Sequence, residues 1–119
     1  MMTLNMNSLA VLTKRCLLHV LERKGEIMNI TSTGGFQTGP YLAIDCATKT
    51  YILSFTESLA AAPSGTEAIV TPFRPGPICS GFGEGAAMNN SALIKDEKLP
   101  TADEVGPAGY GCHPATSMR

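Results

Sequence analysis

The sequence carries little charge, and the charge it has is nearly balanced. Of the 119 residues, 16% are charged, against about 25% in a typical globular protein, and nine basic residues face ten acidic ones. Proteins that bind nucleic acid or a membrane surface through charge need a basic excess, which is absent here. With 44% hydrophobic residues, the composition instead predicts one globular domain with a packed core.

Metal-binding and membrane-spanning patterns are missing as well. The four cysteines lie apart without a C-x-x-C pair, and the two histidines complete no clustered ligand set. This spacing argues against a zinc site and predicts free thiols in a reducing compartment. Lys14 and Arg15 interrupt the apolar N-terminal residues, so no run reaches the ~18 residues of a membrane span. We expect a soluble cytoplasmic protein without a metal.

Residues 3–24 predict one amphipathic helix, and Gly25 suits the left-handed position that often ends a helix. The apolar side chains that recur at helical spacing are Leu9, Leu12, Cys16, Leu17, Val20 and Leu21.

A strand over residues 26–30 follows, and then a polar turn. A second helix is expected from just after Pro40 to about residue 62, and a second strand over 68–71. The order helix, strand, helix, strand is typical of a parallel α/β sheet.

The remainder of the chain has a different composition. Seven of the eight prolines and eight of the twelve glycines lie from residue 63 onward, which predicts loops and short helices. Pro72 is expected to remove a hydrogen bond from the second strand. Thr101 and Glu104 have the spacing of a capping box that starts a helix, and Gly106-Pro107 is expected to break this helix within a turn.

Four polar positions stand at the places where such a fold carries chemistry. Ser32 follows the first strand, at the edge where open α/β sheets bind ligands. Asp45 comes thirteen residues later, and Lys49 lies one helical turn beyond it on the same face. Asn5 lies early in the preceding helix.

These segments resemble the C-terminal half of a short-chain dehydrogenase/reductase. The resemblance rests on "LNMNSLAVLT" around Asn5, "IMNITSTGG" around Ser32, "DCATKTYILSFTESLA" around Lys49 and the later loop "RPGPICSGF". It implies an α/β fold, a partial Rossmann-like fragment of a doubly wound parallel sheet that lacks the N-terminal dinucleotide-binding strands. Within it, residues 1–79 would form the core and residues 80–119 a substrate-loop-like and irregular tail.

The resemblance also implies a role for each matching residue. Ser32 would hold the substrate carbonyl or hydroxyl, Lys49 would bind the nicotinamide ribose of NAD or NADP, and Asn5 would position a water molecule. The side chains that would line the nicotinamide are those of Pro75, Gly76 and Ser80. Residues 82–95 would correspond to the loop that covers the substrate.

Asp45 departs from the family pattern, because it stands where the family has its catalytic tyrosine. A carboxylate is ionised at neutral pH and has no proton to give, and its charge would oppose a developing alkoxide. We expect it to pair with Lys49 instead, an interaction worth about 0.3–0.5 kcal/mol if exposed. Tyr41 could substitute only with its oxygen displaced by a helical turn.

The sequence therefore predicts an NAD(P)-dependent oxidoreductase of a carbonyl or alcohol substrate by descent, truncated and inactive as it stands. The alternative is a non-catalytic module that associates with itself or a partner through helices 3–24 and 41–62, whose apolar faces would be exposed in a monomer. A third possibility, an unrelated enzyme with Ser32 and Lys49 as nucleophile and base, lacks a recognisable oxyanion site.

Overall fold

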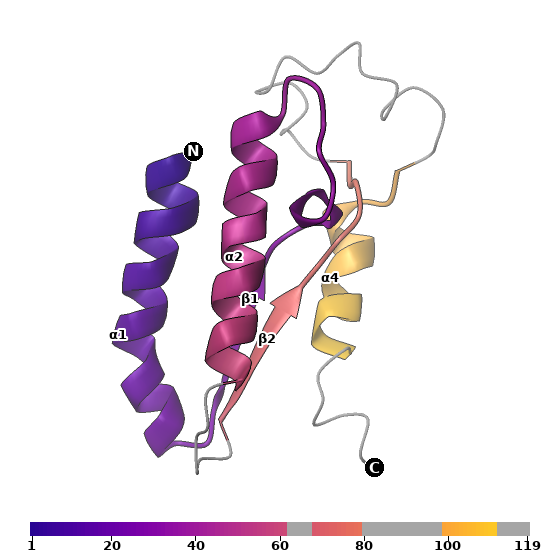
Figure 1. Ribbon diagram of the computed structural model, residues 1–119. Coiled ribbons are helices and arrows are strands. Elements are labelled where there is room, and N and C mark those ends of the chain that lie inside the picture. Colours follow the sequence, from indigo (N-terminus) through magenta and orange to yellow (C-terminus); the bar gives the residue numbers. More distant parts are fainter. Residues whose placement is uncertain (62–67, 80–98, 112–119) are drawn as a thin grey trace. The chain divides into compact units, whose positions relative to one another are not determined.

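The computed structural model describes residues 1–61, 68–79 and 99–111. These residues form two compact units, Met1–Arg74 and Pro75–Arg119, each considered by itself below. The elements of the first unit are η1 (Thr3–Ser8), α1 (Leu9–Glu22), β1 (Glu26–Ile30), η2 (Thr33–Gly35), α2 (Ala43–Ala61) and β2 (Ile69–Phe73). Figure 1 shows them in the predicted order of helix, strand, helix, strand.

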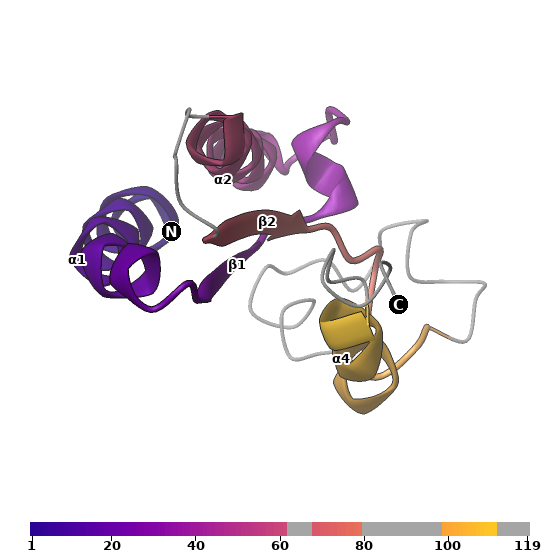
Figure 2. The ribbon, with the colours of Figure 1, turned by 90° about the horizontal axis from the view of Figure 1, so that it is seen from below.

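The two strands form a parallel sheet in which Glu26 of β1 is opposite Ile69 of β2. Asn29 of β1 is buried and donates a hydrogen bond to Thr56 of α2 over 3.0 Å, so α2 covers one face of the sheet (Figure 2). The core of the unit is centred on α2, where Thr48, Ile52, Leu53 and Thr56 are buried. The predicted parallel α/β architecture is confirmed.

Pro72 lies inside β2, which extends to Phe73 instead of ending at residue 71. Ile69 donates its amide to Gly25 over 3.1 Å, and the carbonyl of Phe73 accepts from Thr31 over 2.8 Å. Residues 69, 71 and 73 therefore face β1, and the nitrogen of Pro72 faces the opposite edge. Pro72 therefore removes no hydrogen bond between β1 and β2, and the predicted loss of a bond from the second strand could apply only to its other edge.

The first helical segment also differs in detail from the prediction. It begins with a π-helical stretch, η1, and continues as α1. Thr13 is its buried residue, whereas Leu12 and Cys16 from the predicted apolar stripe are exposed. The prediction of one buried apolar stripe was partly wrong, because apolar residues occupy more than one side of this helix.

The left-handed residue at the end of α1 is Lys24, with φ 52°, and not Gly25. The amide of Gly25 bonds to the carbonyl of Val20 over 2.8 Å, and that of Lys24 lies 3.5 Å from the carbonyl of Leu21. This is the pattern of a Schellman motif, which satisfies the last carbonyls of a helix. The motif turns the chain from α1 into β1.

The described part of the second unit contains α4 (Ala102–Gly111) and a parallel bridge between Cys79 and Thr101. The capping box is confirmed: Thr101 donates its amide to Glu104 Oε2 over 2.8 Å, and Glu104 donates its amide back to Thr101 Oγ1 over 3.4 Å. The predicted break at Gly106-Pro107 was wrong. α4 continues through Pro107 to Gly111, so the helix tolerates both the missing amide of Pro107 and the close approach of its ring to the preceding turn.

Within the described ranges, no helix is long and apolar enough to cross a lipid bilayer. The segment proposed to cover the substrate, residues 82–95, lies outside these ranges.

Candidate functional site

Ser32 lies where β1 ends, as predicted, and caps the short helix η2. Its backbone is extended, with φ −165° and ψ 163°, and its Oγ accepts a hydrogen bond from the amide of Gly34 over 3.2 Å. A hydroxyl that accepts one bond still has its own proton to donate. The bond to Gly34 therefore leaves the hydroxyl proton of Ser32 free, while its predicted contact with a substrate oxygen stays a prediction.

The turn that carries Ser32 is attached directly to the helical turn that carries Lys49. Thr31, the residue before Ser32, is only 1% exposed and donates its hydroxyl to the carbonyl of Lys49 over 2.9 Å. Figure 1 shows η2 beside α2, in agreement with this bond. The structure thus brings the segments of Ser32 and Lys49 together, as the resemblance implies.

Lys49 does not form the expected ion pair with Asp45. No ion pair joins the two side chains, and Lys49 is half-buried. Oδ1 of Asp45 is buried and accepts no hydrogen bond from any described group. The prediction was wrong because this oxygen is turned into the protein, and an exposed pair of this kind is too weak to bring it out.

Asn5 is connected to the same part of α2 through a side chain that the sequence did not single out. Its Nδ2 donates to Thr48 Oγ1 over 3.0 Å, and Thr48 in turn donates to the carbonyl of Asp45 over 2.9 Å. The carbonyl of Asp45 is therefore linked to η1 by two hydrogen bonds. Asn5, Asp45 and Lys49 share one region, although the roles assigned to them remain predictions.

Tyr41 does not take the position of the missing phenol. It precedes α2, has a left-handed backbone with φ 65°, and is fully exposed. The side chain is therefore in solvent, ahead of Ala43, the first residue of α2.

The predicted nicotinamide-lining residues belong to the second unit. Pro75 is half-buried, and a Cβ on Gly76 would meet no atom within 4 Å. Ser80 lies outside the described residues. The part that these three residues play in binding a cofactor stays a prediction.

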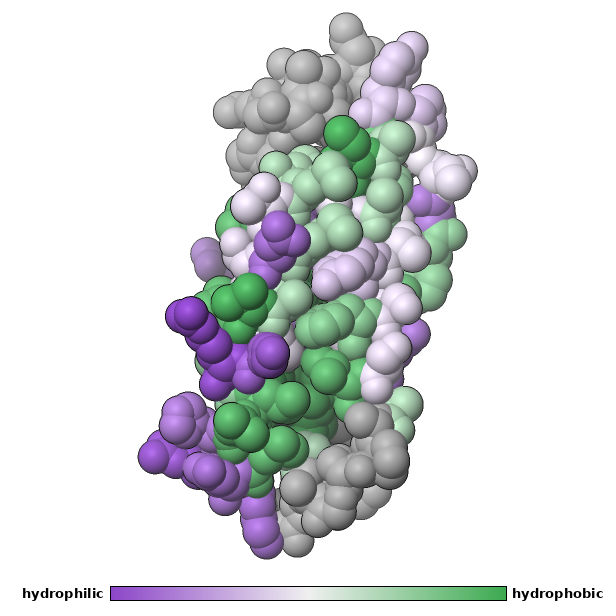
Figure 3. Space-filling model, turned by 60° about the vertical axis from the view of Figure 1, so that its left-hand side comes forward, coloured by the Kyte–Doolittle hydropathy of each residue, from purple (hydrophilic) through white to green (hydrophobic). Residues whose placement is uncertain are grey.

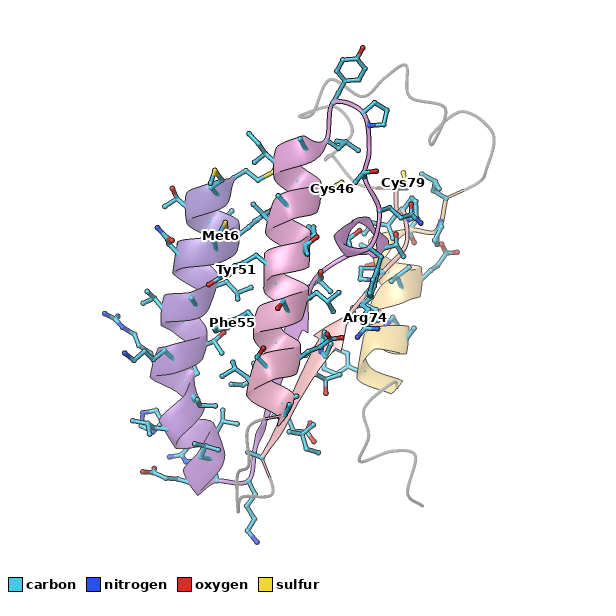
Figure 4. The ribbon with its side chains drawn as sticks, viewed as in Figure 1. Met6, Cys46, Tyr51, Phe55, Arg74 and Cys79 are labelled. Atoms are coloured by element: carbon cyan, nitrogen blue, oxygen red, sulfur yellow. The ribbon has the colours of Figure 1, made fainter. Side chains whose placement is uncertain are left out.

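An open hollow of about 320 Å³ lies beside the turn, between residues 37–39 and α2. Its lining consists of Gln37, Thr38, Gly39, Ala43, Cys46, Ala47 and Thr50. None of the four predicted catalytic residues lines it. Figure 4 shows Cys46 on the side of α2 that faces the turn. Among the described side chains, no group of three metal-binding residues is close enough to hold an ion.

The ammonium of Lys49 makes no ion pair or hydrogen bond with another described residue. Its predicted role, binding the ribose of a nicotinamide nucleotide, stays a prediction. The threonines around it were missed by sequence reasoning. Threonine is common in polar turns and at half-buried helix positions, and nothing in the spacing of Thr31, Thr48 and Thr50 distinguished them.

Comparison with known proteins agrees with this arrangement. Residues 1–90 match the short chain dehydrogenase family. A solved structure, the closed form of serine dehydrogenase complexed with NADP⁺, superposes with a TM-score of 0.81 at 25% identity. The match covers 97% of this chain and 50% of that chain, so this chain spans about half the length of the solved one. No curated protein matches. Since the family match extends over about three-quarters of the sequence, the chain belongs to the short chain dehydrogenase family.

Proposed function

We propose that this chain provides the substrate side of an NAD(P)-dependent oxidoreductase site for a carbonyl or alcohol. The observation that supports this most directly is the Thr31–Lys49 hydrogen bond, which joins the segment of Ser32 to that of Lys49 in a member of a dehydrogenase family. That family membership does not favour a purely non-catalytic module.

In this proposal, Ser32 donates its hydroxyl proton to the substrate oxygen, since the bond accepted from the amide of Gly34 uses one lone pair and leaves the proton free. Lys49 binds the ribose hydroxyls of the nicotinamide nucleotide through its free ammonium. NAD(P), when bound, supplies or accepts the hydride. Asn5, fixed to Thr48, contributes its remaining amide groups to the placement of a water molecule.

Asp45 is the residue of this proposed site that is least suited to catalysis. A carboxylate cannot protonate an alkoxide, and its negative charge opposes the charge that develops on the substrate oxygen. Its Oδ1 is also buried, so this oxygen is not available to a ligand. We therefore propose that these 119 residues alone do not turn over a substrate.

The test is a calorimetric titration with NADPH and NADH together with a carbonyl-reduction assay. We expect no saturable binding and no turnover from the 119 residues. A saturable isotherm would contradict the proposal that the 119 residues do not bind the cofactor. If Lys49→Met abolished that binding, the proposed role of Lys49 would still be supported. At millimolar NADPH, any NMR shift changes should centre on Lys49. Changes centred elsewhere would contradict the proposed site.

Asp45→Tyr is expected to leave turnover absent, since a phenol alone supplies no binding surface for the rest of the cofactor. The measurement is NADPH oxidation with a panel of small ketones, with the unaltered chain as control. Measurable oxidation by Asp45→Tyr would show that position 45 is the sole defect.

We also propose that the chain forms a homo-oligomer through α1 and α2. Exposed apolar side chains on η1, which leads into α1, and on α1 and α2 themselves are Leu4, Val11, Leu12, Leu18 and Ile44. Figure 3 shows an apolar surface along this side of the helix pair, with hydrophilic side chains beside it. Contiguous apolar surface of this kind marks interaction sites in many proteins.

A further inference from the structure

The turn between β1 and α2 packs closely against α2 and is hydrogen-bonded to it at several points. Gly35 of η2 is buried, and a Cβ on it would lie 3.2 Å from the carbonyl oxygen of Lys49. That is closer than such contacts normally are, so the backbone of the turn approaches the helix as near as a glycine allows.

Two threonine hydroxyls reinforce this close approach from opposite sides. Thr31 Oγ1 donates to the carbonyl of Lys49 over 2.9 Å. Thr50 Oγ1 lies 2.9 Å from the carbonyls of both Gly35 and Cys46, and its one proton is shared between them. One hydroxyl thus reaches from the turn to the helix, and the other reaches from the helix to the turn.

The bonds flank the residues proposed to bind the ligand. Thr31 is adjacent to Ser32 in the chain, and Thr50 is adjacent to Lys49. Ser32 itself is tied to the turn by the amide of Gly34, and the amide of Gly35 returns to the carbonyl of Ser32 over 3.0 Å. The position of Ser32 relative to the backbone of Lys49 therefore depends on whether the turn stays closed on α2.

We propose that Thr31 and Thr50 are positioning residues that form a two-sided clamp, here called the threonine clamp, and that the clamp sets the distance between Ser32 and Lys49. This assignment rests on the proposed function for its purpose, since one ligand must contact both residues. The clamp itself depends only on the two hydroxyls and on Gly35. It gives a role to the hydroxyl of Thr31, which is buried and hydrogen-bonded to α2.

The test replaces each hydroxyl by a methyl group of similar shape, in Thr31→Val and Thr50→Val. The readout is amide hydrogen exchange of Gly34 and Gly35 by NMR, which reports local opening of the turn. Each variant should raise the exchange rate about fivefold, the factor expected from the loss of one hydrogen bond of ordinary strength. The backbone signals of Ser32 and Lys49 should shift together.

Thr56→Val is the matched control. Thr56 is also a fully buried threonine of α2, and its hydroxyl bonds to Ile52 and accepts from Asn29. Its loss should lower the free energy of unfolding without changing exchange at Gly34 and Gly35. Thr31→Ser and Thr50→Ser retain the hydroxyl and should restore slow exchange.

Unchanged exchange in both clamp variants would overturn the proposal, and so would an equal change in Thr56→Val or a failure of the serine variants to restore protection. Thr50 is exposed, so Thr50→Val should fold even if Thr31→Val does not. These readouts need no cofactor, and therefore they remain decisive whether or not the chain binds NADPH. A functional failure and a failure of the clamp are thus separate results.

Discussion

Single residues decide what this site can do. Ser32 and Lys49 keep the groups that the family pattern needs, a hydroxyl with a free proton and an ammonium without a described partner. In the proposed site, Asp45 would change the chemistry, because a carboxylate with one buried oxygen would stand where a phenol would donate a proton. The family relationship therefore holds for the fold, and in the proposed site the proton-transfer step would lack its donor.

Asp45→Ala should stabilise the protein by about 1 kcal/mol. An unsatisfied buried acceptor costs about 1–3 kcal/mol, more than the 0.3–1 kcal/mol that a carboxylate gains in the first turn of a helix. Urea unfolding followed by circular dichroism measures the difference. Asp45→Asn keeps an acceptor oxygen and should gain less. A loss of stability in Asp45→Ala would show that the carboxylate has a partner after all.

At the scale of elements, residues at the helix ends determine where α1 ends and where α4 begins. The end of α1 is a Schellman motif in which a lysine occupies the left-handed position. The start of α4 is a capping box whose two residues satisfy each other's amides. Both features set where an element ends or begins, and both can be tested without reference to activity.

Lys24→Gly should be more stable than Lys24→Ala by about 1 kcal/mol, because a left-handed backbone strains any residue that has a Cβ. The comparison between the two variants removes the contribution of the lysine side chain, which both lack. Thermal unfolding under identical conditions gives the difference. Equal stability of the two variants would mean that the α1–β1 junction relaxes to another conformation.

The capping box makes the start of α4 sensitive to acid. The backbone amide of Thr101, and then its hydroxyl, lower the pKa of Glu104 below its ordinary value. A lowered carboxyl pKa stabilises the folded helix above the ordinary glutamate range, and this contribution is lost as the pH falls through the lowered pKa. NMR titration of the Glu104 carboxyl follows the effect directly.

Thr101→Ala should raise the pKa of Glu104 only part of the way, since the amide that contributes most remains. Thr101→Ser should keep it low. A pKa in Thr101→Ala that equals the ordinary value would assign the effect to the hydroxyl alone.

At the scale of the whole molecule, α1 and α2 leave some apolar side chains exposed, while other apolar side chains of these helices are packed within the protein. Figure 4 shows Tyr51 and Phe55 on the side of α2 that faces α1, and their rings stack with centroids 5.8 Å apart. On the outer surface, Leu12 and Leu18 are 61% and 67% exposed. The pair of helices thus has one apolar side used within the chain and another that is open.

Leu12→Glu with Leu18→Glu should lower the mass of the protein measured by sedimentation equilibrium toward that of a monomer, because a charge would have to be buried at the contact. Tyr110→Glu, a change at an equally exposed aromatic residue of α4, is the control and should leave the mass unchanged. A monomer at all concentrations in the unaltered chain would contradict the proposed homo-oligomer.

Much of the architecture was determined by the sequence itself. The spacing of apolar residues and the identity of turn residues are local properties of the sequence. They predicted β1 over residues 26–30, the order of elements and the capping box of α4. The spacing of Asn5, Ser32 and Lys49 also identified the family, because a family pattern is a property of residue type and separation along the chain. Gly106-Pro107 was expected to break a helix, although α4 continues through Pro107.

The tertiary structure alone decided which groups face each other. Asp45 and Lys49 are one turn apart in sequence, and yet the burial of Asp45 Oδ1 keeps them from pairing. Thr31 and Thr50 are ordinary threonines until the turn closes on α2 and gives their hydroxyls carbonyl partners 18 and 15 residues away in the chain. Hydrogen bonds between distant segments depend on how helix and strand pack, and residue spacing along a chain does not contain that information.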